Sequence, residues 1–280
     1  MKEERKHSKF SASGAERWVQ CSASVEASEG QPDKDTPWSI EGTLAHSVLE
    51  TILRAMIDAK SLAKVTTSAP VPTEMKMHAM SAANFIFDLG KNLDAEILVE
   101  QKVYLDFIHP EMFGTFDGAV LDHFGTLHVF DFKYGAGHAV SPKENLQMIF
   151  YGLGLAHKYQ WNFQNVRLWI IQPRIKGYDG PTYWDISISD LKKYEQFFKD
   201  AVERVEKRPE FKEGSWCHWC KAKNACPLKK QMKDDKAIEM FKQNPLKGGE
   251  YGKEEKENKG ESETKKACRE ARGEAIGDFY

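Results

Sequence analysis

The segments GTFDGAVLD (114–122) and TLHVFDFK (126–133) decide the fold of this sequence. Both have the pattern of strands, and a turn is predicted between them near Phe124-Gly125. We therefore predict an antiparallel hairpin centred on Phe124. In a hairpin that is symmetric about this residue, Asp117 and Asp131 face each other across the two strands.

The rest of the chain alternates between helical and strand patterns around this hairpin. A short helix capped by Ser11 or Ser13 is predicted to run to Cys21. Apolar residues recur at helical spacing in four longer segments, residues 41–59, 73–89, 145–158 and 190–207. Further strands are predicted at residues 96–105, 166–172 and 182–188. The order helix, three strands, helix, strand predicts an α/β domain with helices packed against a mostly buried sheet.

Composition narrows the class of protein. The 280 residues are 41% hydrophobic, which suits one large domain or two small ones. The formal net charge of -2 excludes a uniformly basic nucleic-acid coat and leaves room for a local basic path. No apolar run is long enough for a membrane span. The start MKEERKHSKF has no apolar core, so we expect no secretory signal and a cytoplasmic, reducing setting.

Three parts of the chain are predicted from composition. Residues 1–10 are expected to be a flexible N-terminus, and residues 11–233 a single domain. Residues 234–280 are expected to form a charged, disordered tail. From Leu246 onward, 17 of the 35 residues are charged and six are glycine, which is too little apolar material to bury. Cys268 in this tail is interpreted as a free surface thiol.

The hairpin pairs two acidic side chains in an apolar setting. Facing carboxylates repel each other, and burial increases the cost. A divalent cation such as Mg²⁺ or Mn²⁺ between Asp117 and Asp131 would remove the repulsion. Lys133 lies on the same face as Asp131 and could orient or deprotonate an attacking water. The alternative is that Asp131 and Lys133 form an ordinary exposed ion pair.

Two helical pairs accompany the hairpin. His46 and Glu50 are four residues apart and share a helix face, so His46 could complete a metal site. Gln147 and Tyr151 are also four apart, on the helix that follows Lys133, and could contact substrate phosphate. The alternatives are a structural histidine and a polar edge on a packed helix.

The cysteines suggest a second site. The spacing Cys217-x2-Cys220-x5-Cys226 lets neighbouring thiolates reach one metal centre. Cys21 is the candidate fourth ligand, with His218 as a less favourable one. Tetrahedral zinc and an iron–sulfur cluster both fit this pattern, and four unligated thiols are the remaining alternative.

A basic segment surrounds these cysteines. Residues 199–233 contain ten Lys and Arg against five Asp and Glu, interleaved with two Trp. Such a segment suits a strand of phosphates, although a solvated helix face explains its first half equally well. The densest part comprises Lys221, Lys223, Lys229 and Lys230.

The ordered set of these motifs resembles a known family. His46, Asp117, Asp131-x-Lys133 and Gln147-x3-Tyr151 together resemble the PD-(D/E)XK nucleases, specifically the RecB-like branch with its restriction-endonuclease-like core. One cysteine before these motifs and three after them resemble the iron–sulfur version found in AddB and in CRISPR-associated adaptation nucleases. The resemblance covers roughly residues 8–230 and is closer still to proteins of phage and prophage recombination modules.

The resemblance implies roles for individual residues. His46, Asp117 and Asp131 would be Mg²⁺ or Mn²⁺ ligands, and Asp117, Asp131 and Lys133 the catalytic residues. Glu100 is a weaker candidate for an outer ligand, because the sequence does not settle which face it is on. The strand-contacting residues would be Gln147, Tyr151, Lys221 and Lys223. A [4Fe–4S] cluster joining the two ends of the domain would be held by Cys21, Cys217, Cys220 and Cys226.

The resemblance implies a metal-dependent deoxyribonuclease, expected to act as an exonuclease on single strands or duplex ends. The sequence has no G-x-x-x-x-G-K-[ST] phosphate loop, so a helicase or recombination protein is expected as a partner in trans. Two alternatives remain open. One is a non-catalytic DNA-binding module that keeps the nuclease fold, and the other is a four-thiolate zinc protein.

Overall fold

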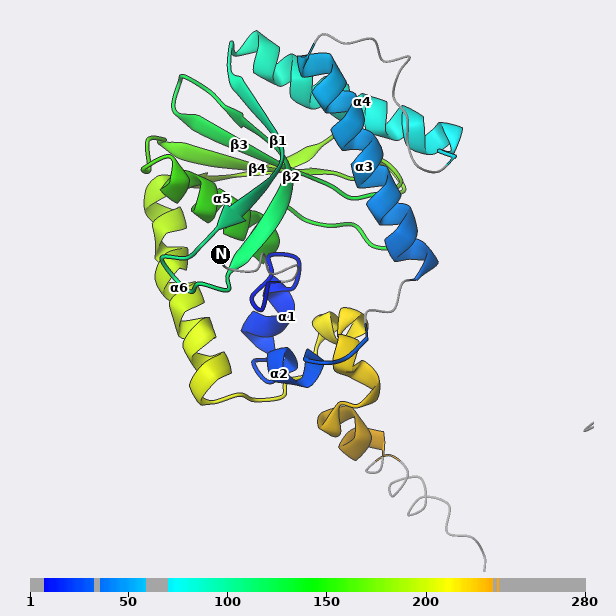
Figure 1. Cartoon of the computed structure of the whole chain (residues 1–280), viewed down its shortest axis with the longest axis vertical. Coiled ribbons are helices and arrows are strands. Elements are labelled where there is room, and N and C mark those ends of the chain that lie inside the picture. Colours follow the sequence, from blue (N-terminus) through cyan, green and yellow to red (C-terminus); the bar gives the residue numbers. More distant parts are fainter. Residues whose placement is uncertain (1–7, 33–35, 59–69, 234–235, 237–280) are drawn as a thin grey trace, which may run out of the picture. The chain divides into compact units, whose positions relative to one another are not determined.

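A five-stranded sheet with the order β1-β2-β3-β4-β5 organises the part of the chain that the computed structural model describes, residues 8–32, 36–58, 70–233 and 236 (Figure 1). β3 and β4 are parallel, and the other neighbouring strands are antiparallel. A parallel pair needs a crossover connection, and α5 supplies it. The strands are β1 (Glu96–Tyr104), β2 (Phe113–Leu121), β3 (Thr126–Phe132), β4 (Asn165–Ile171) and β5 (Thr182–Ser187).

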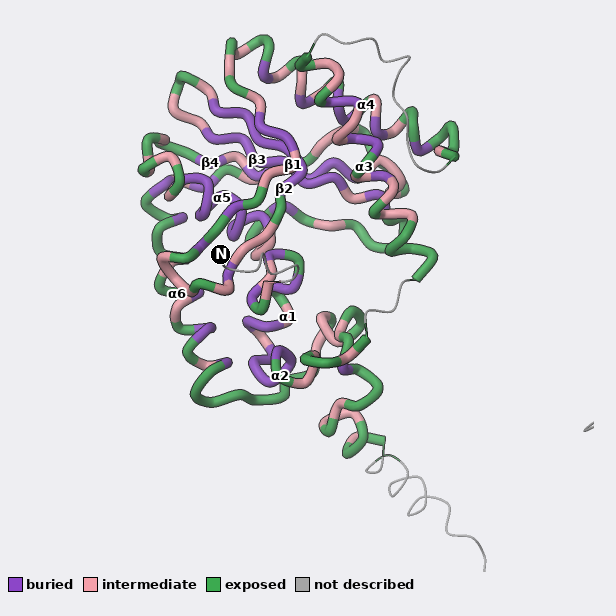
Figure 2. The backbone as a smooth tube through the Cα atoms, in the orientation of Figure 1, coloured by how far each residue is buried: buried purple, intermediate pink, exposed green. Residues whose placement is uncertain are grey.

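Helices cover both faces of the sheet, which confirms the predicted α/β fold (Figure 1). The helices are α1 (Ala15–Gln20), α2 (Ser24–Ser28), α3 (Pro37–Ile57), α4 (Thr73–Asn92), α5 (Leu146–Lys158) and α6 (Ile188–Lys207), followed by the 3-10 helices η2 (Ser215–Trp219) and η3 (Lys221–Asn224). One core lies between the sheet and α3 and α4, and a second lies between the sheet and α1, α5 and α6. Buried backbone therefore runs through the middle of the molecule, between the helical layers (Figure 2). Among the described helices, none has the length and apolar content required to cross a membrane.

The β2–β3 hairpin has the predicted register. Gly118 pairs with Phe130, and the pairing continues toward the turn. Asp122 closes the turn, because its Oδ1 accepts hydrogen bonds from two backbone amides, including that of Thr126 at 2.8 Å. Gly125 has φ +94°, a conformation that glycine adopts without steric cost.

The strand β1 loses its alternation at Glu100. Leu98 and Val103 are five residues apart, so regular alternation would place them on opposite faces, yet both belong to the same core. Between them, Glu100 has φ +45°, which is rare for a residue with a side chain. The β1–β2 register on either side places Glu100 opposite Asp117. The distortion of the sheet therefore coincides with one of the candidate metal ligands.

The helix α3 begins four residues earlier than the predicted start at residue 41. Thr36 caps it, since the Thr36 side chain accepts from Ser39 N–H and the Ser39 side chain accepts from Thr36 N–H. Pro37 occupies the first helical position, where its missing N–H costs nothing. The capping signal was therefore present in the sequence, upstream of the apolar pattern on which the prediction relied.

The fold includes residues that the sequence analysis assigned to a flexible N-terminus. Phe10 is fully buried in the core, and Ser8 Oγ donates to Glu111 O at 2.7 Å. Residues 8–10 are therefore part of the folded domain. The chain divides into the units Met1–Lys233 and Asp234–Tyr280. Residues 1–7, Ala59 and the tail beyond residue 236, with Cys268, lie outside the described residues.

The packing of α5 against β1 can be tested with one glycine. A methyl group on Gly154 would overlap the side chain of Val103 and lie 2.7 Å from Leu105 Cδ1. We expect Gly154→Ala to lower the free energy of unfolding by about 1–3 kcal/mol, the usual cost of overpacking. Gly42→Ala in α3 is the matched control, since its methyl group would meet nothing within 4 Å. In urea unfolding, Gly42→Ala should raise the free energy of unfolding by about 0.5–1 kcal/mol, because alanine favours a helix more than glycine does. Equal stability of both variants would contradict the described packing.

Candidate active site and cysteine pocket

Polar side chains from four elements meet where β2 and β3 stop pairing. The regular ladder ends at Gly118 and Phe130. Just beyond it, the Phe132 amide donates a hydrogen bond of 2.6 Å to Asp117 Oδ2, so a side chain replaces the missing backbone partner. The cluster comprises His46, Asp117, Asp131, Lys133, Gln147 and Tyr151, all of which the sequence analysis singled out.

The two aspartates approach this cluster from opposite sides. Asp117 turns toward α3, where its Oδ1 lies 2.8 Å from His46 Nδ1. Asp131 turns toward α5, where its Oδ1 accepts from Gln147 Nε2 at 2.9 Å. The sequence analysis expected both on one face. The loss of alternation opposite Glu100 explains the difference, because it redirects Asp117 toward α3.

Both carboxylates are buried, with 8% of Asp117 and 3% of Asp131 exposed. Burial raises the pKa of Asp131, the nearby Lys133 ammonium opposes this rise, and the charge of Asp117 adds to it. Burial alone would lower the pKa of His46, but its hydrogen bond to Asp117 and the charges of both aspartates raise that pKa overall. The aspartates are therefore close enough to influence each other and the same imidazole.

Lys133 is held as a cation. Its Nζ lies 2.9 Å from Asp131 Oδ2 and donates to Gln147 Oε1 at 2.9 Å. Burial alone would lower the pKa of Lys133, but the attraction of Asp131 and Asp117 outweighs burial and raises it. The side chain can therefore stabilise negative charge at this site. Both roles expected from the sequence, orienting a water and deprotonating it, stay predictions for this side chain.

Gln147 and Tyr151 hold the cation and carboxylate in place. Gln147 contacts Lys133 and Asp131 and also donates to the Tyr151 hydroxyl at 3.1 Å. Only 4% of Tyr151 is exposed, and burial raises the pKa of its hydroxyl well above the usual value. A neutral, buried Tyr151 supports Gln147 from behind and is too enclosed to make the direct substrate contact that the sequence suggested.

Glu100 joins the acidic side of the cluster. Burial, followed by the charges of Asp117 and Glu50, raises the pKa of Glu100 to about 7. Arg54 donates to Glu50 Oε1 and to the Val99 carbonyl, each at 2.9 Å, and so is tied to the same strand. The sequence analysis ranked Glu100 low. Pairing β1 with β2 in register would have revealed it, because that register places Glu100 opposite Asp117.

The donor set has the chemistry that a hard divalent cation requires. Carboxylate oxygens and an imidazole converge, and the buried Asp131 Oδ2 lies 2.9 Å from the Lys133 ammonium. A cation there would offset the mutual repulsion of the acids. In this structure the Asp131 oxygens contact Lys133 Nζ and Gln147 Nε2, each at 2.9 Å. Within the described ranges, no three His, Cys, Asp or Glu side chains are close enough together to hold a metal ion.

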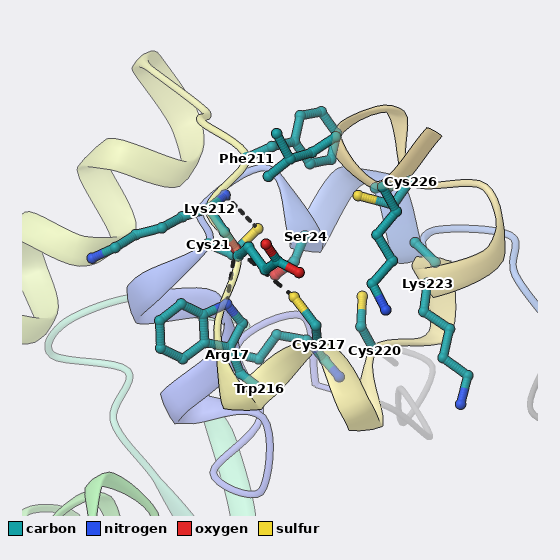
Figure 3. A pocket seen from close by; sticks show the side chains of 15 residues that line it. Arg17, Cys21, Ser24, Phe211, Lys212, Trp216, Cys217, Cys220, Lys223 and Cys226 are labelled. Carbon is teal, nitrogen blue, oxygen red and sulfur yellow. Dashed lines mark hydrogen bonds between the residues drawn. The ribbon is translucent and has the colours of Figure 1, made fainter. Parts of the chain in front are cut away.

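Four thiols from the two ends of the domain line a second site, a small cavity of about 20 Å³. Their sulfur atoms point into this cavity (Figure 3). Lys212 N–H donates to Cys21 Sγ at 3.4 Å, which links the segment after α6 to the end of α1. Burial raises the pKa of the Cys21 thiol, with a smaller contribution from two of the other cysteines. The cavity is lined by Cys21, Cys217, Cys220 and Cys226.

The closed four-cysteine centre expected from the sequence stays a prediction. The four thiols are free and share the cavity without approaching one another as ligands of one ion do in the described part of the chain. The basic residues Lys221 and Lys223 belong to η3 beside this cavity, and Lys223 Nζ donates to His218 O at 3.3 Å. Both are exposed, so the predicted basic path lies at the cysteine pocket and does not include the carboxylate cluster.

Three solved structures resemble the chain at low sequence identity. A crystal structure described as a "putative exonuclease" from Eubacterium rectale shares 11% identity, over 74% of this chain and 83% of that one, with a TM-score of 0.40. An alkaline exonuclease from Laribacter hongkongensis shares 12% identity, over 60% and 93% of the two chains, with a TM-score of 0.29. The protein SSO0001 shares 17% identity, over 65% and 84%, with a TM-score of 0.30. These likenesses are distant.

One family model matches nearly the whole sequence. The match spans residues 7–265 and therefore includes the carboxylate cluster and the four thiols of the cysteine pocket. The chain belongs to the family described as Protein of unknown function (DUF2800).

Proposed function

We propose that the protein is a Mg²⁺- or Mn²⁺-dependent nuclease that hydrolyses the phosphodiester bonds of DNA. The observation that carries this proposal is the convergence of two buried aspartates and a half-buried lysine, whose ammonium lies 2.9 Å from Asp131 Oδ2, where the β2–β3 ladder ends. Buried like charges are costly for a protein, and their presence is best explained by chemistry that uses them. The expectation that digestion starts from a strand end comes from the resemblance noted in the sequence.

Each residue of the cluster has a role in this proposal. His46, Asp117 and Asp131 would hold the cation, with Glu100 at the margin of the site. A bound divalent cation supplies Lewis-acid polarisation of the phosphate and lowers the pKa of an attached water. Lys133 stabilises the negative charge that develops on the phosphoryl oxygens. Gln147 and Tyr151 act as positioning residues, because they fix Lys133 and Asp131 and remain behind them.

Loss of cleavage on removal of a charge is the direct test. We expect Asp117→Asn, Asp131→Asn and Lys133→Met each to lower the rate of DNA hydrolysis in Mn²⁺ by about 10²-fold or more, the usual cost of losing one transition-state contact. Asp88→Asn on the exposed side of α4 is the matched control and should cleave at the original rate. The assay is gel analysis of labelled linear single strands. Full activity in all three variants would refute the proposal, and DNA binding by the unaltered protein without any product would favour the non-catalytic alternative.

Digestion from an end makes a separate prediction. Linear single-stranded DNA should be shortened progressively in Mn²⁺, while a circular single strand of the same composition should persist under the same conditions. Labels at the two ends of the linear strand then report the polarity. Rapid cutting of the circle would show an endonuclease and would leave only the hydrolytic part of the proposal standing.

We also propose that the four thiols of the cysteine pocket hold a metal centre, a [4Fe–4S] cluster by the resemblance. Thiolates are soft ligands that suit iron–sulfur clusters and zinc, and a ligand from each end of the domain would tie those ends together. In this role Cys21, Cys217, Cys220 and Cys226 saturate the centre and leave no open position for catalysis.

Metal analysis distinguishes the possible centres. An anaerobically purified protein is expected to be brown and to contain iron, and Cys217→Ser should lose both the colour and solubility. Cys268→Ser, outside the described residues, is the matched control and should retain them. A colourless protein that contains zinc would replace the iron–sulfur assignment, and a protein with neither metal would refute the centre.

A further inference from the structure

An arginine lies at the same sheet edge as the candidate catalytic residues. β3 and β4 are parallel, so their carboxyl ends meet at one edge, where the Lys133 amide donates to Ile171 O at 2.9 Å. Tyr134 follows Lys133 at the end of β3, and Arg174 follows three residues after β4. The Arg174 guanidinium lies over the Tyr134 ring, 4.6 Å from its centroid. Arg174 therefore contacts the residue that directly follows Lys133 in the chain.

The guanidinium is anchored by one of its nitrogens. Arg174 Nη1 donates to Glu41 Oε1 at 2.9 Å and, more weakly, to the Tyr134 carbonyl at 3.3 Å. Its Nε and Nη2 groups have no hydrogen-bond partner among the described residues, and 24% of the side chain is exposed. A planar guanidinium with a free N–H edge is suited to bidentate contact with a phosphate.

The other cations near the cluster are already engaged. Lys133 contacts Asp131 and Gln147. Arg54 uses Nε for Glu50 and Nη2 for a backbone carbonyl. A polyanionic strand approaching buried aspartates needs positive charge near the point of attack, because the acids repel it. Among the described residues, Arg174 keeps both Nε and Nη2 unpaired, whereas Arg54 keeps Nη1 alone.

Three glycines close in sequence to the partners of Arg174 face open space. A methyl group on Gly42, which adjoins Glu41 in α3, would meet nothing within 4 Å. The same holds for Gly135, which follows Tyr134, and for Gly137 in the same loop. Gln172 fixes this loop, since its side-chain amide donates to the carbonyls of Gly135 and His138 at 2.9 Å. The loop that follows Tyr134 is thus held by Gln172 and leaves Gly135 and Gly137 uncovered.

We propose that Arg174 forms a second phosphate subsite, which binds a backbone phosphate of the nucleotide strand next to the phosphate being hydrolysed. This inference rests on the proposed nuclease function and adds a positioning residue to it. In the free protein, Glu41 holds the guanidinium in place over Tyr134. When a nucleotide strand binds, its phosphate accepts hydrogen bonds from Nε and Nη2 of Arg174. Glu41 competes with this phosphate for the positive charge of the guanidinium.

The competing explanation is a purely structural ion pair that ties α3 to the end of β4. The two explanations predict different effects for the two partners. If Arg174 binds phosphate, loss of Arg174 weakens strand binding, whereas loss of the Glu41 charge leaves binding unchanged or strengthens it. If the Arg174–Glu41 ion pair is purely structural, removing either partner has the same effect on strand binding and on the free energy of unfolding.

The experiment measures binding of a fluorescent single-stranded oligonucleotide in Ca²⁺, which takes the same oxygen ligands, over a range of salt concentrations. We expect Arg174→Gln to raise the Kd by about 10- to 100-fold, the range for one charge-assisted hydrogen bond. The slope of log K against log salt should fall by about 0.7, the value for one phosphate contact on a single strand. The Kd of Arg174→Lys should lie between those of the unaltered protein and Arg174→Gln, because lysine keeps the positive charge but lacks the paired N–H donors of a guanidinium. Glu41→Gln should bind at least as tightly as the unaltered protein.

Arg167→Gln is the matched control. Arg167 is also on β4, lies over the Tyr183 ring at 4.3 Å and pairs with Asp185, but at the opposite end of the strand. Its replacement should leave the Kd and the salt slope unchanged, and urea unfolding of every variant separates binding from stability.

Equal weakening of binding by Arg174→Gln and Glu41→Gln, with equal losses of stability, would overturn the subsite in favour of the structural tie. Cleavage by the unaltered protein together with undiminished strand binding by Arg174→Gln would overturn the subsite alone. Absence of both binding and cleavage in the unaltered protein would overturn the nuclease proposal and this inference with it.

Discussion

One hydrogen bond, from the Phe132 amide to the Asp117 carboxylate, determines how the site is built. It forms where the β2–β3 ladder has ended, so it replaces a backbone contact with a charge-assisted one that is stronger than a neutral bond. Because the acceptor is a side chain, the strands can separate without leaving a buried amide unpaired. That separation makes room for α3 and α5 to bring His46 and Gln147 to the same point from opposite faces of the sheet.

The electrostatic cost of this arrangement is concentrated on a few groups. Burial raises the pKa of Asp131 and raises that of Glu100 to about 7, while Lys133 remains charged between them and α5. The left-handed backbone at Glu100 adds conformational strain at the same place. Strain and unfavourable charge that coincide with a polar cluster are typical of sites kept for chemistry, since a purely structural core would replace them with apolar side chains.

The sequence was sufficient for the hairpin register and for the helices that carry the six polar residues, because alternation, the central turn and helical spacing are local patterns. It did not predict how Asp117 turns toward His46 beside the irregular part of β1, since β1 pairs with β2 only in the folded sheet. The same non-local pairing hid Glu100. Residues 8–10 were missed because the burial of Phe10 depends on distant partners. Arg174 has no motif, and its importance follows only from the parallel pairing of β3 with β4.

The cysteine pocket has a consequence for how the molecule is made. Its walls come from segments that are far apart in the chain, and Lys212 contacts Cys21 across 191 positions of sequence. On a ribosome that adds 5–20 residues per second, the first thiol would wait roughly 10 to 40 s for its companions. Any ion delivered to this pocket must therefore arrive after most of the sheet has been synthesised. Throughout that interval, the Cys21 thiol can react with oxidants and other thiol reagents before the later cysteines are present.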